Sequence, residues 1–280
     1  MSTVLQRERR ELAVALFQRP ASSPEQLFLF DTGLLYISNS AYRQIKRPRE
    51  AAVLIAISQG PFEIRSRGQS LTTEVAAIGS LVSHSIHSVG VPCASVLVAP
   101  DHPHFRVFRH ISRPGVLPLP PDAYRRFNAE LTAARRGDLA AADAHRLFES
   151  IVATTAVYLP RPEPMDPRVA RIIAHLRGNE DCRLDDLADL ACLSYYRLSH
   201  LFSENVGLSL RSYRLWRKLR KAIAFLVDGH KQSDIAAWSG FTDTAHFHRA
   251  CYETYGFRPS FIVSGRIAFV RQRAYAGLEK

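Results

Sequence analysis

The second half of the sequence contains an internal near-repeat, and this repeat restricts the fold more than any other feature of the chain. Residues 187–209, LADLACLSYYRLSHLFSENVGLS, align with residues 235–260, IAAWSGFTDTAHFHRACYETYGFRPS. The alignment sets Leu198 against Phe247 and Gly207 against Gly256, with one extra residue at the turn of the second copy. Each copy shows a short helix, a tight turn, a polar N-cap and a longer helix that ends at glycine. The pattern predicts two helix-turn-helix units.

The N-cap candidates are Ser194 in the first copy and Thr242 or Asp243 in the second. Between the copies, residues 211–221, RSYRLWRKLRK, contain six positive residues and no acidic one. The whole chain has a formal net charge of +11, which favours a polyanionic partner.

The longer helix of the second copy divides into two faces at about 100° per residue. One face, expected to pack, consists of Phe247, Ala250, Cys251 and Thr254. The opposite face, expected to be presented, consists of Thr244, Ala245, His248, Arg249 and Tyr252. In the first copy, Leu198, Leu201 and Phe202 are expected to pack, which leaves Tyr196, Arg197, Ser199, His200 and Ser203 outward. Any surface helix has a polar face, but the duplication, the caps and the basic segment together favour insertion into a DNA major groove.

A proline-rich segment divides the chain. Residues 157–167, VYLPRPEPMDP, carry four prolines in eleven residues, which blocks helix and strand continuation. We therefore expect two domains, of residues 1–160 and 161–280.

The first part of the chain alternates short apolar runs with turn residues. The runs are EQLFLFDTGLLYIS, AAVLIAIS, FEIRSR, VAAIGSLVSHSIHSV, ASVLVAP and HFRVFRHI, and they predict the strands of a small antiparallel barrel or sandwich. After Asp122, an apolar three- or four-residue spacing predicts two amphipathic helices, through Tyr124, Phe127, Leu131, Leu147, Ile151 and Tyr158. These helices either mediate dimerisation or cover one face of the barrel.

The C-terminal part resembles the DNA-binding domain of the AraC/XylS family of bacterial transcription regulators. The resemblance rests on Ile235-Ala236, Gly240-Phe241, Phe247, Arg249-Ala250, Tyr255-Gly256 and Pro259-Ser260 in the second unit, and on Leu187-Ala188, Ser194, Leu198, Leu201-Phe202 and Gly207-Leu208 in the first. It implies that RLWRKLRKAIAFL forms a long helix connecting the units. Two positions depart from the family pattern: His200 stands where arginine is usual, and Cys251 where phenylalanine is usual.

The resemblance also implies roles for individual residues. Base-reading positions are Tyr196, His200, Thr244, Ala245 and His248. Phosphate contacts are expected from Arg197, Arg217, Lys218, Lys221 and Arg249, although a solvated face is an equal alternative for the three in the connecting segment.

The first domain resembles, more weakly, the cupin-like sensing domain of many members of this family. We therefore expect an α+β protein: an N-terminal cupin-like small β-barrel with flanking helices, and a C-terminal all-α domain with two helix-turn-helix units joined by a long helix. The resemblance implies an effector of unknown identity or a dimer contact in the first domain.

Two histidine pairs, His84 with His87 and His102 with His104, invite comparison with a metal site. Neither pair is a defined ligand signature, and hydrogen-bonding surface histidines explain them, so we expect no metal and no cofactor. The basic groups Arg65 with Arg67, and Lys46 with Arg47 and Arg49, suit either an anionic effector or a solvated edge.

Other classes of protein fit the sequence less well. No apolar run approaches the roughly 20 residues of a membrane span, and charges interrupt the start of the chain where a signal peptide needs an apolar core, so we expect a cytoplasmic protein. The four cysteines form no CxxC pair. Convergent carboxylates, a nucleophile motif and a phosphate loop are absent from the sequence, which argues against an enzyme.

The sequence therefore predicts a sequence-specific transcription regulator, an activator controlled by a small molecule. The expected partners are double-stranded DNA, RNA polymerase, the effector and a second copy of the chain, with no membrane partner. The alternative is a constitutive DNA binder whose first domain serves only dimerisation or protein contacts.

Overall fold

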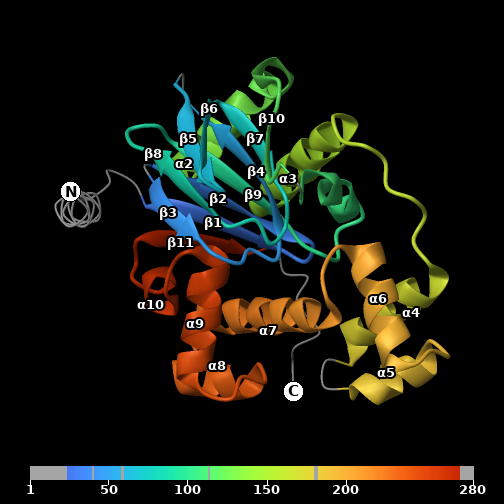
Figure 1. The fold of residues 1–280 in the computed structure, drawn as a ribbon. Helices are drawn as coiled ribbons and strands as arrows, with labels where there is room; N and C mark the ends of the chain where they lie inside the picture. The colour runs from blue at the N-terminus through green and yellow to red at the C-terminus, as the bar shows by residue number, and fades with distance from the viewer. Residues whose placement is uncertain (1–23, 40, 58–59, 113, 180–181, 272–280) are drawn as a thin grey trace, which may run out of the picture.

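The computed structural model describes residues 24–39, 41–57, 60–112, 114–179 and 182–271. It combines a sheet-rich N-terminal domain with a helical C-terminal domain, as predicted (Figure 1). Residues 1–23, on which the expectation about a signal peptide depends, lie outside the described residues. No described helix is both long enough and apolar enough to cross a lipid bilayer.

The strands form a seven-stranded and a four-stranded sheet. The larger sheet has the order β10 (Val116–Pro118), β7 (Val75–Ile78), β4 (Ala51–Ala56), β9 (Cys93–Val98), β2 (Gly33–Ser38), β1 (Glu25–Phe30) and β11 (Ile267–Arg271). The smaller sheet has the order β3 (Ala41–Ile45), β8 (His84–Ser88), β5 (Phe62–Ser66) and β6 (Gln69–Thr73). The sheets share a core but no strand pairing among the described residues, so they make a sandwich and not a closed barrel.

The larger sheet is buried on both faces. On β4, Ala52 and Leu54 face the smaller sheet, while Val53 and Ile55 belong to the cluster formed with the helices. This explains the continuous apolar run of this strand. The helices that cover the sheet are α2 (Asn128–Arg136) and α3 (Ala141–Val157), which follow the short turns η2 (Pro121–Ala123) and η3 (Arg125–Phe127). The two predicted amphipathic helices therefore cover one face of the sheet, and their role in dimerisation stays a prediction.

The run HFRVFRHI was predicted as a strand, and that prediction was wrong. Residues Phe105–Ser112 form a 3₁₀ helix, η1. Three of its buried side chains, Phe105, Phe108 and Ile111, recur every third residue, which is the period of a 3₁₀ helix, and Val107 is buried beside them.

The C-terminal domain contains α4 (Pro167–Gly178), α5 (Leu184–Leu190), α6 (Tyr195–Val206), α7 (Leu210–Val227), α8 (Gln232–Trp238), α9 (Thr244–Tyr255) and α10 (Pro259–Ile262). Residues 158–166, within the proline-rich segment, form neither helix nor strand. The domain border at residue 160 stays a prediction.

The strand β11 was not predicted. It follows the helical domain in sequence but joins the N-terminal sheet, where it pairs in parallel with β1 from Glu25 opposite Ile267 onward (Figure 1). Its pairing covers the edge of β1, which would otherwise expose unpaired backbone groups. The end of the described chain therefore ties the second helix-turn-helix unit back to the first domain.

Candidate nucleic-acid interface

The two helix-turn-helix units are built alike. Ser194 accepts a hydrogen bond from the backbone N–H of Arg197 at 3.4 Å, and Asp243 accepts one from that of His246 at 2.6 Å. Asp243, and not Thr242, is therefore the N-cap of α9. The longer helices of the two units, α6 and α9, are the candidates for reading DNA and are called the reading helices below. They end at Gly207 and Gly256, whose φ angles of 85° and 77° lie in the left-handed region that glycine adopts without strain.

The connecting helix α7 packs against both units, one with each half. Tyr213 and Trp216 share a core with Phe202 of α6, whereas Leu219 packs in the cluster of Phe247 of α9. Figure 1 shows α7 below the sheets, with α6 near one end and α9 near the other. The two reading helices are therefore held by one continuous helix.

Three of the five residues predicted to face outward on α6 are exposed, whereas Ser199 and Ser203 are half-buried. Tyr196 is 71% exposed, and Arg197 and His200 are exposed beside it. The rings of Tyr196 and His200 lie edge to face with centroids 4.5 Å apart. The two base-reading candidates of this unit thus form one aromatic surface.

The faces of α9 are also distributed as predicted. Phe247, Ala250, Cys251 and Thr254 are buried. Ala245, Arg249 and Tyr252 are exposed, while Thr244 and His248 are half-buried.

A polar contact that the sequence analysis missed fixes His248. Its Nε2 lies 2.6 Å from Oε1 of Gln232, the first residue of α8. This contact explains why His248 is only half-exposed: its ring is tied to the preceding helix. Base and phosphate roles for the residues of α6 and α9 stay predictions.

The three phosphate candidates on α7 have intramolecular neighbours. Arg217 lies 3.3 Å from Asp101 of the N-terminal domain and donates to the backbone carbonyl of Arg177. Lys218 donates to the backbone carbonyl of Gly240, and Lys221 is half-buried. A phosphate contact by Arg217 would thus require the ion pair with Asp101 to break.

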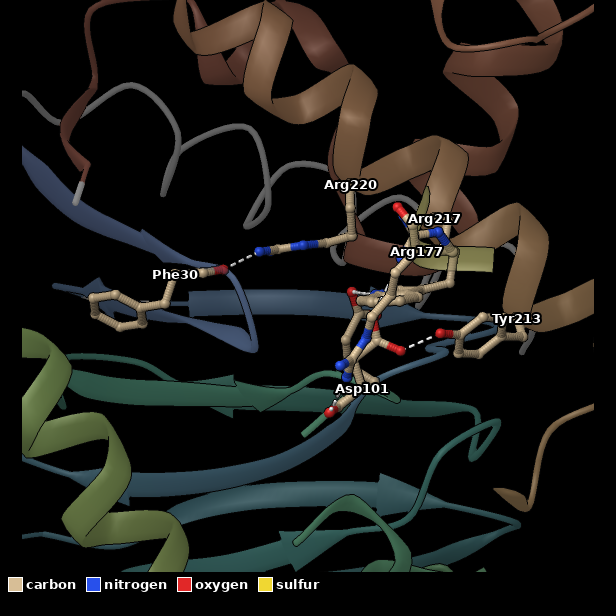
Figure 2. A network of polar contacts seen from close by, with 8 residues as sticks. Phe30, Asp101, Arg177, Tyr213, Arg217 and Arg220 are labelled. Carbon is tan, nitrogen blue, oxygen red and sulfur yellow. Dashed lines mark hydrogen bonds and ion pairs between the residues drawn. The ribbon is translucent and has the colours of Figure 1, made fainter. Parts of the chain in front are cut away.

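One face of α7 docks on the N-terminal domain through side chains three to four residues apart. Tyr213 donates to Asp101, Arg217 pairs with the same carboxylate, and Arg220 donates to the backbone carbonyl of Phe30 (Figure 2). Arg220 also donates to the backbone carbonyl of Gly33 across the β1–β2 turn. Burial raises the pKa of Tyr213, and the adjacent Asp101 raises it further, so this phenol stays a hydrogen-bond donor.

Trp216 makes the central contact of this docking face. Its Nε1 donates to Glu50 Oε1 at 2.9 Å, and Tyr255 of α9 donates to the same oxygen at 3.0 Å. Burial raises the pKa of Glu50, while the nearby Arg220 acts to lower it. A single buried carboxyl group therefore binds both the connecting helix and the second reading helix.

The N-terminal domain also binds the C-terminal end of each reading helix. On α6, Arg106 donates to the backbone carbonyl of Asn205 at 2.7 Å, and Arg109 to that of Glu204. The last carbonyls of a helix lack intrahelical partners and carry the negative end of the helix dipole, so guanidinium groups stabilise them. This contact comes from the segment η1, which the sequence analysis had assigned to a strand.

On α9, the loop after β3 supplies equivalent bonds. The backbone N–H groups of Lys46 and Arg47 donate to the carbonyl of Glu253 at 3.1 and 2.8 Å. Arg49 donates to the hydroxyl group of Thr254 and is only 5% exposed, so Arg49 does not lie on a solvated edge as one alternative held.

A cavity of about 40 Å³ lies between the two sheets and the end of α9. Most of its walls are apolar side chains of the sheets, and Thr254, Tyr255 and Phe257 close one side. A wall of the cavity is therefore part of the second helix-turn-helix unit.

One histidine of each pair in the first domain is buried. His84 and His102 are 4% and 3% exposed, contrary to the expectation of hydrogen-bonding surface histidines. His84 Nδ1 lies 2.8 Å from the carbonyl of Val82, and His102 Nε2 lies 3.1 Å from Glu149. Burial lowers the pKa of both imidazoles. Across the described residues, no three metal-ligating side chains converge on one point.

The comparisons with known proteins agree with this architecture. A family model described as a helix-turn-helix domain matches residues 187–263, which include both units and α7. A search of curated protein sequences returns no match.

Solved structures of ToxT from Vibrio cholerae are similar to the chain along most of its length. The apo form of a ToxT variant has a TM-score of 0.57 and 12% identity, covering 84% of this chain and 98% of that one. Wild-type ToxT bound to an unsaturated fatty acid has a TM-score of 0.53 and 11% identity, covering 88% and 97%. ToxT bound to a naphthalenyl butenoic acid has a TM-score of 0.54 and 12% identity, covering 87% and 100%.

These identities are low, so the likeness to ToxT concerns the fold, whereas the family model identifies the sequence of the C-terminal domain. The resemblance to AraC/XylS regulators is therefore confirmed: the chain has the fold of ToxT and carries an AraC-type helix-turn-helix domain, the DNA-binding module of a class of transcription regulators.

Proposed function

We propose that the protein is a sequence-specific transcription activator whose two reading helices enter adjacent segments of the DNA major groove and whose N-terminal domain binds a small-molecule effector. The observation that carries the proposal is the attachment of both reading helices to the N-terminal domain at their C-terminal ends. Tyr196 and Ala245, in the N-terminal halves of these helices, are exposed. The domain can therefore alter the placement of both helices without covering the side chains that would read DNA.

Base reading is assigned to Tyr196, His200, Thr244, Ala245 and His248, and phosphate binding to Arg197, Arg217, Lys218, Lys221 and Arg249. Residues near the start of a recognition helix reach base edges, and flanking basic residues reach the backbone. Arg217 would act only after leaving Asp101.

Effector control is supported by the position of the cavity, because a ligand between the sheets would contact the last turn of α9 directly. A ligand changes DNA binding only through different affinities for two arrangements of the protein. RNA polymerase and a second copy of the chain stay predicted partners.

The alternative is constitutive DNA binding with an N-terminal domain that serves only dimerisation or protein contacts. The small size of the cavity favours it, since ligand pockets are commonly several hundred Å³, about ten times larger.

The test is selection of bound duplexes from a random library by the full-length protein, followed by mapping of bound sites in the source organism. Recovery of one preferred sequence, with affinity that falls steeply with salt, supports the proposal. Binding without sequence preference contradicts it. Unchanged DNA affinity in the presence of every compound that raises the melting temperature would favour the constitutive alternative.

A further inference from the structure

We propose that the cavity binds a small neutral molecule with an apolar body and a hydroxyl group that bonds the Glu50 carboxyl group. This proposal rests on the proposed function, because it names the chemical class of the effector. It comes from the walls of the cavity and from one buried oxygen atom.

The walls of the cavity require an apolar body. Leu34, Ile45, Leu54, Ile78 and Ile86 all line it, and each is at most 9% exposed. A cavity of about 150 Å³ accommodates benzene. The volume of about 40 Å³ found here restricts the occupant to a molecule smaller than benzene and excludes a long acyl chain in this arrangement.

The buried oxygen is Oε2 of Glu50. Glu50 lines the cavity and is 3% exposed. Its Oε1 accepts from both Trp216 and Tyr255, but Oε2 has no hydrogen-bond partner among the described residues. An unsatisfied buried oxygen costs free energy, and a ligand that bonds it removes that cost.

A hydroxyl group suits this oxygen in either protonation state. A hydroxyl donates to a carboxylate and accepts from a carboxylic acid, so it bonds Glu50 whether or not the carboxyl group is ionised. A ligand carboxylate would be repelled by an ionised Glu50. A ligand ammonium would lie near the guanidinium of Arg43, which lines the same cavity, and beside a carboxyl group whose charge already interacts with Arg49 and Arg220.

Occupancy of the cavity would act on the second helix-turn-helix unit. The ligand would bond the same carboxyl group that holds Trp216 of α7 and Tyr255 of α9. The indole of Trp216 is therefore a reporter of binding, and replacement of the other tryptophan, Trp238, isolates its fluorescence.

The experiment uses the full-length Trp238→Phe protein and four probes that share one ethyl group and are all smaller than benzene: ethanol, propane, ethylamine and propionate. We expect saturable binding of the alcohol, seen as a change in Trp216 emission and a higher melting temperature, at least about tenfold tighter than binding of each of the others. Equal or tighter binding of the alkane, the amine or the acid would overturn the proposal.

A cavity-filling variant gives a second measurement that does not disturb Glu50. Ala52 is 5% exposed and lines the cavity, so Ala52→Val should abolish binding of the alcohol, whereas Ala142→Val on the exposed side of α3 should not. Undiminished binding to Ala52→Val would place the alcohol elsewhere and overturn the site. Both variants are checked for unfolding in urea.

The same preparations are tested for DNA selectivity, which separates the two proposals. A preferred duplex sequence together with no discrimination among the four probes would overturn the ligand class and leave the proposed function standing. Tight, selective binding of the alcohol by a protein that selects no DNA sequence would support the ligand class and contradict the regulator.

Discussion

The indole Nε1 of Trp216 lies 2.9 Å from Oε1 of Glu50, and this hydrogen bond joins the middle of the connecting helix to the residue before strand β4. Both residues are buried, at 2% and 3% exposure. Because Tyr255 bonds the same oxygen, the carboxyl group couples the position of the connecting helix to that of the second reading helix.

Glu50→Gln should make stability less dependent on pH. Burial raises the pKa of Glu50 in the folded state. The contribution of Glu50 to the free energy of unfolding is therefore fully present below the unfolded-state pKa and is lost as the pH rises through the folded-state pKa. The neutral amide keeps an oxygen that accepts from Trp216 and Tyr255. The free energy of unfolding, measured in urea between pH 5 and pH 8, should rise in the variant relative to the wild type as the pH rises. A difference that is constant or of opposite sign would contradict the raised pKa of Glu50.

Asp101→Asn should strengthen DNA binding. The substitution weakens the hold of the N-terminal domain on Tyr213 and removes the ion pair that keeps Arg217 from phosphate. The plot of log affinity against log salt should steepen by about one additional phosphate contact. Glu63→Gln, which removes a carboxylate remote from α7, is the matched control. Unchanged affinity in Asp101→Asn would show that Arg217 is not a phosphate-binding residue.

His248→Ala and Arg249→Ala should affect DNA binding in different ways. Loss of the imidazole should cost about 1–3 kcal/mol on the preferred site and relax the preference at particular base pairs, whereas loss of the guanidinium should weaken binding to all sequences and reduce the salt slope. Gln232→Ala should partly reproduce the His248 phenotype, since Gln232 fixes the ring. Equal losses of affinity across all sequences for both α9 variants would show that His248 is not a base-reading residue.

Arg106→Ala should destabilise the end of α6. The guanidinium bonds the carbonyl of Asn205 at the C-terminal end of the helix, and its loss should lower the free energy of unfolding by about 1 kcal/mol. Specificity should fall at the base pairs read by Tyr196 and His200 and stay intact at those read by α9. Arg136→Ala, on the exposed side of α2, is the control. A uniform change across the whole DNA site would contradict separate anchoring of the two reading helices.

The sequence was sufficient for features that depend on neighbouring residues. The repeat, the cap at Ser194 and the packing of Phe247 follow from helical periodicity and turn chemistry, which act over three or four positions. The sequence left Thr242 and Asp243 as alternative caps of α9, and the structure selected Asp243. Most strands of the first domain were predictable for the same reason. The segment η1 was not, because Phe105, Val107 and Ile111 fit an alternating strand while Phe105, Phe108 and Ile111 fit a three-residue period, and only packing on the sheet selected the latter.

The coupling between the domains was decided by tertiary structure alone. Glu50 and Trp216 are 166 positions apart in the sequence. No sequence pattern around Glu50 identifies it as a partner of α7. Arg217 illustrates the same limit: the family resemblance left phosphate binding and a solvated face as equal alternatives, but docking of α7 brings Arg217 to Asp101. Local sequence thus determined the two reading units and their exposed faces, since those depend on the chain's own period. Packing of the two domains decided which polar groups are buried, which are paired and which remain available to DNA, because those properties arise only when distant surfaces exclude water together.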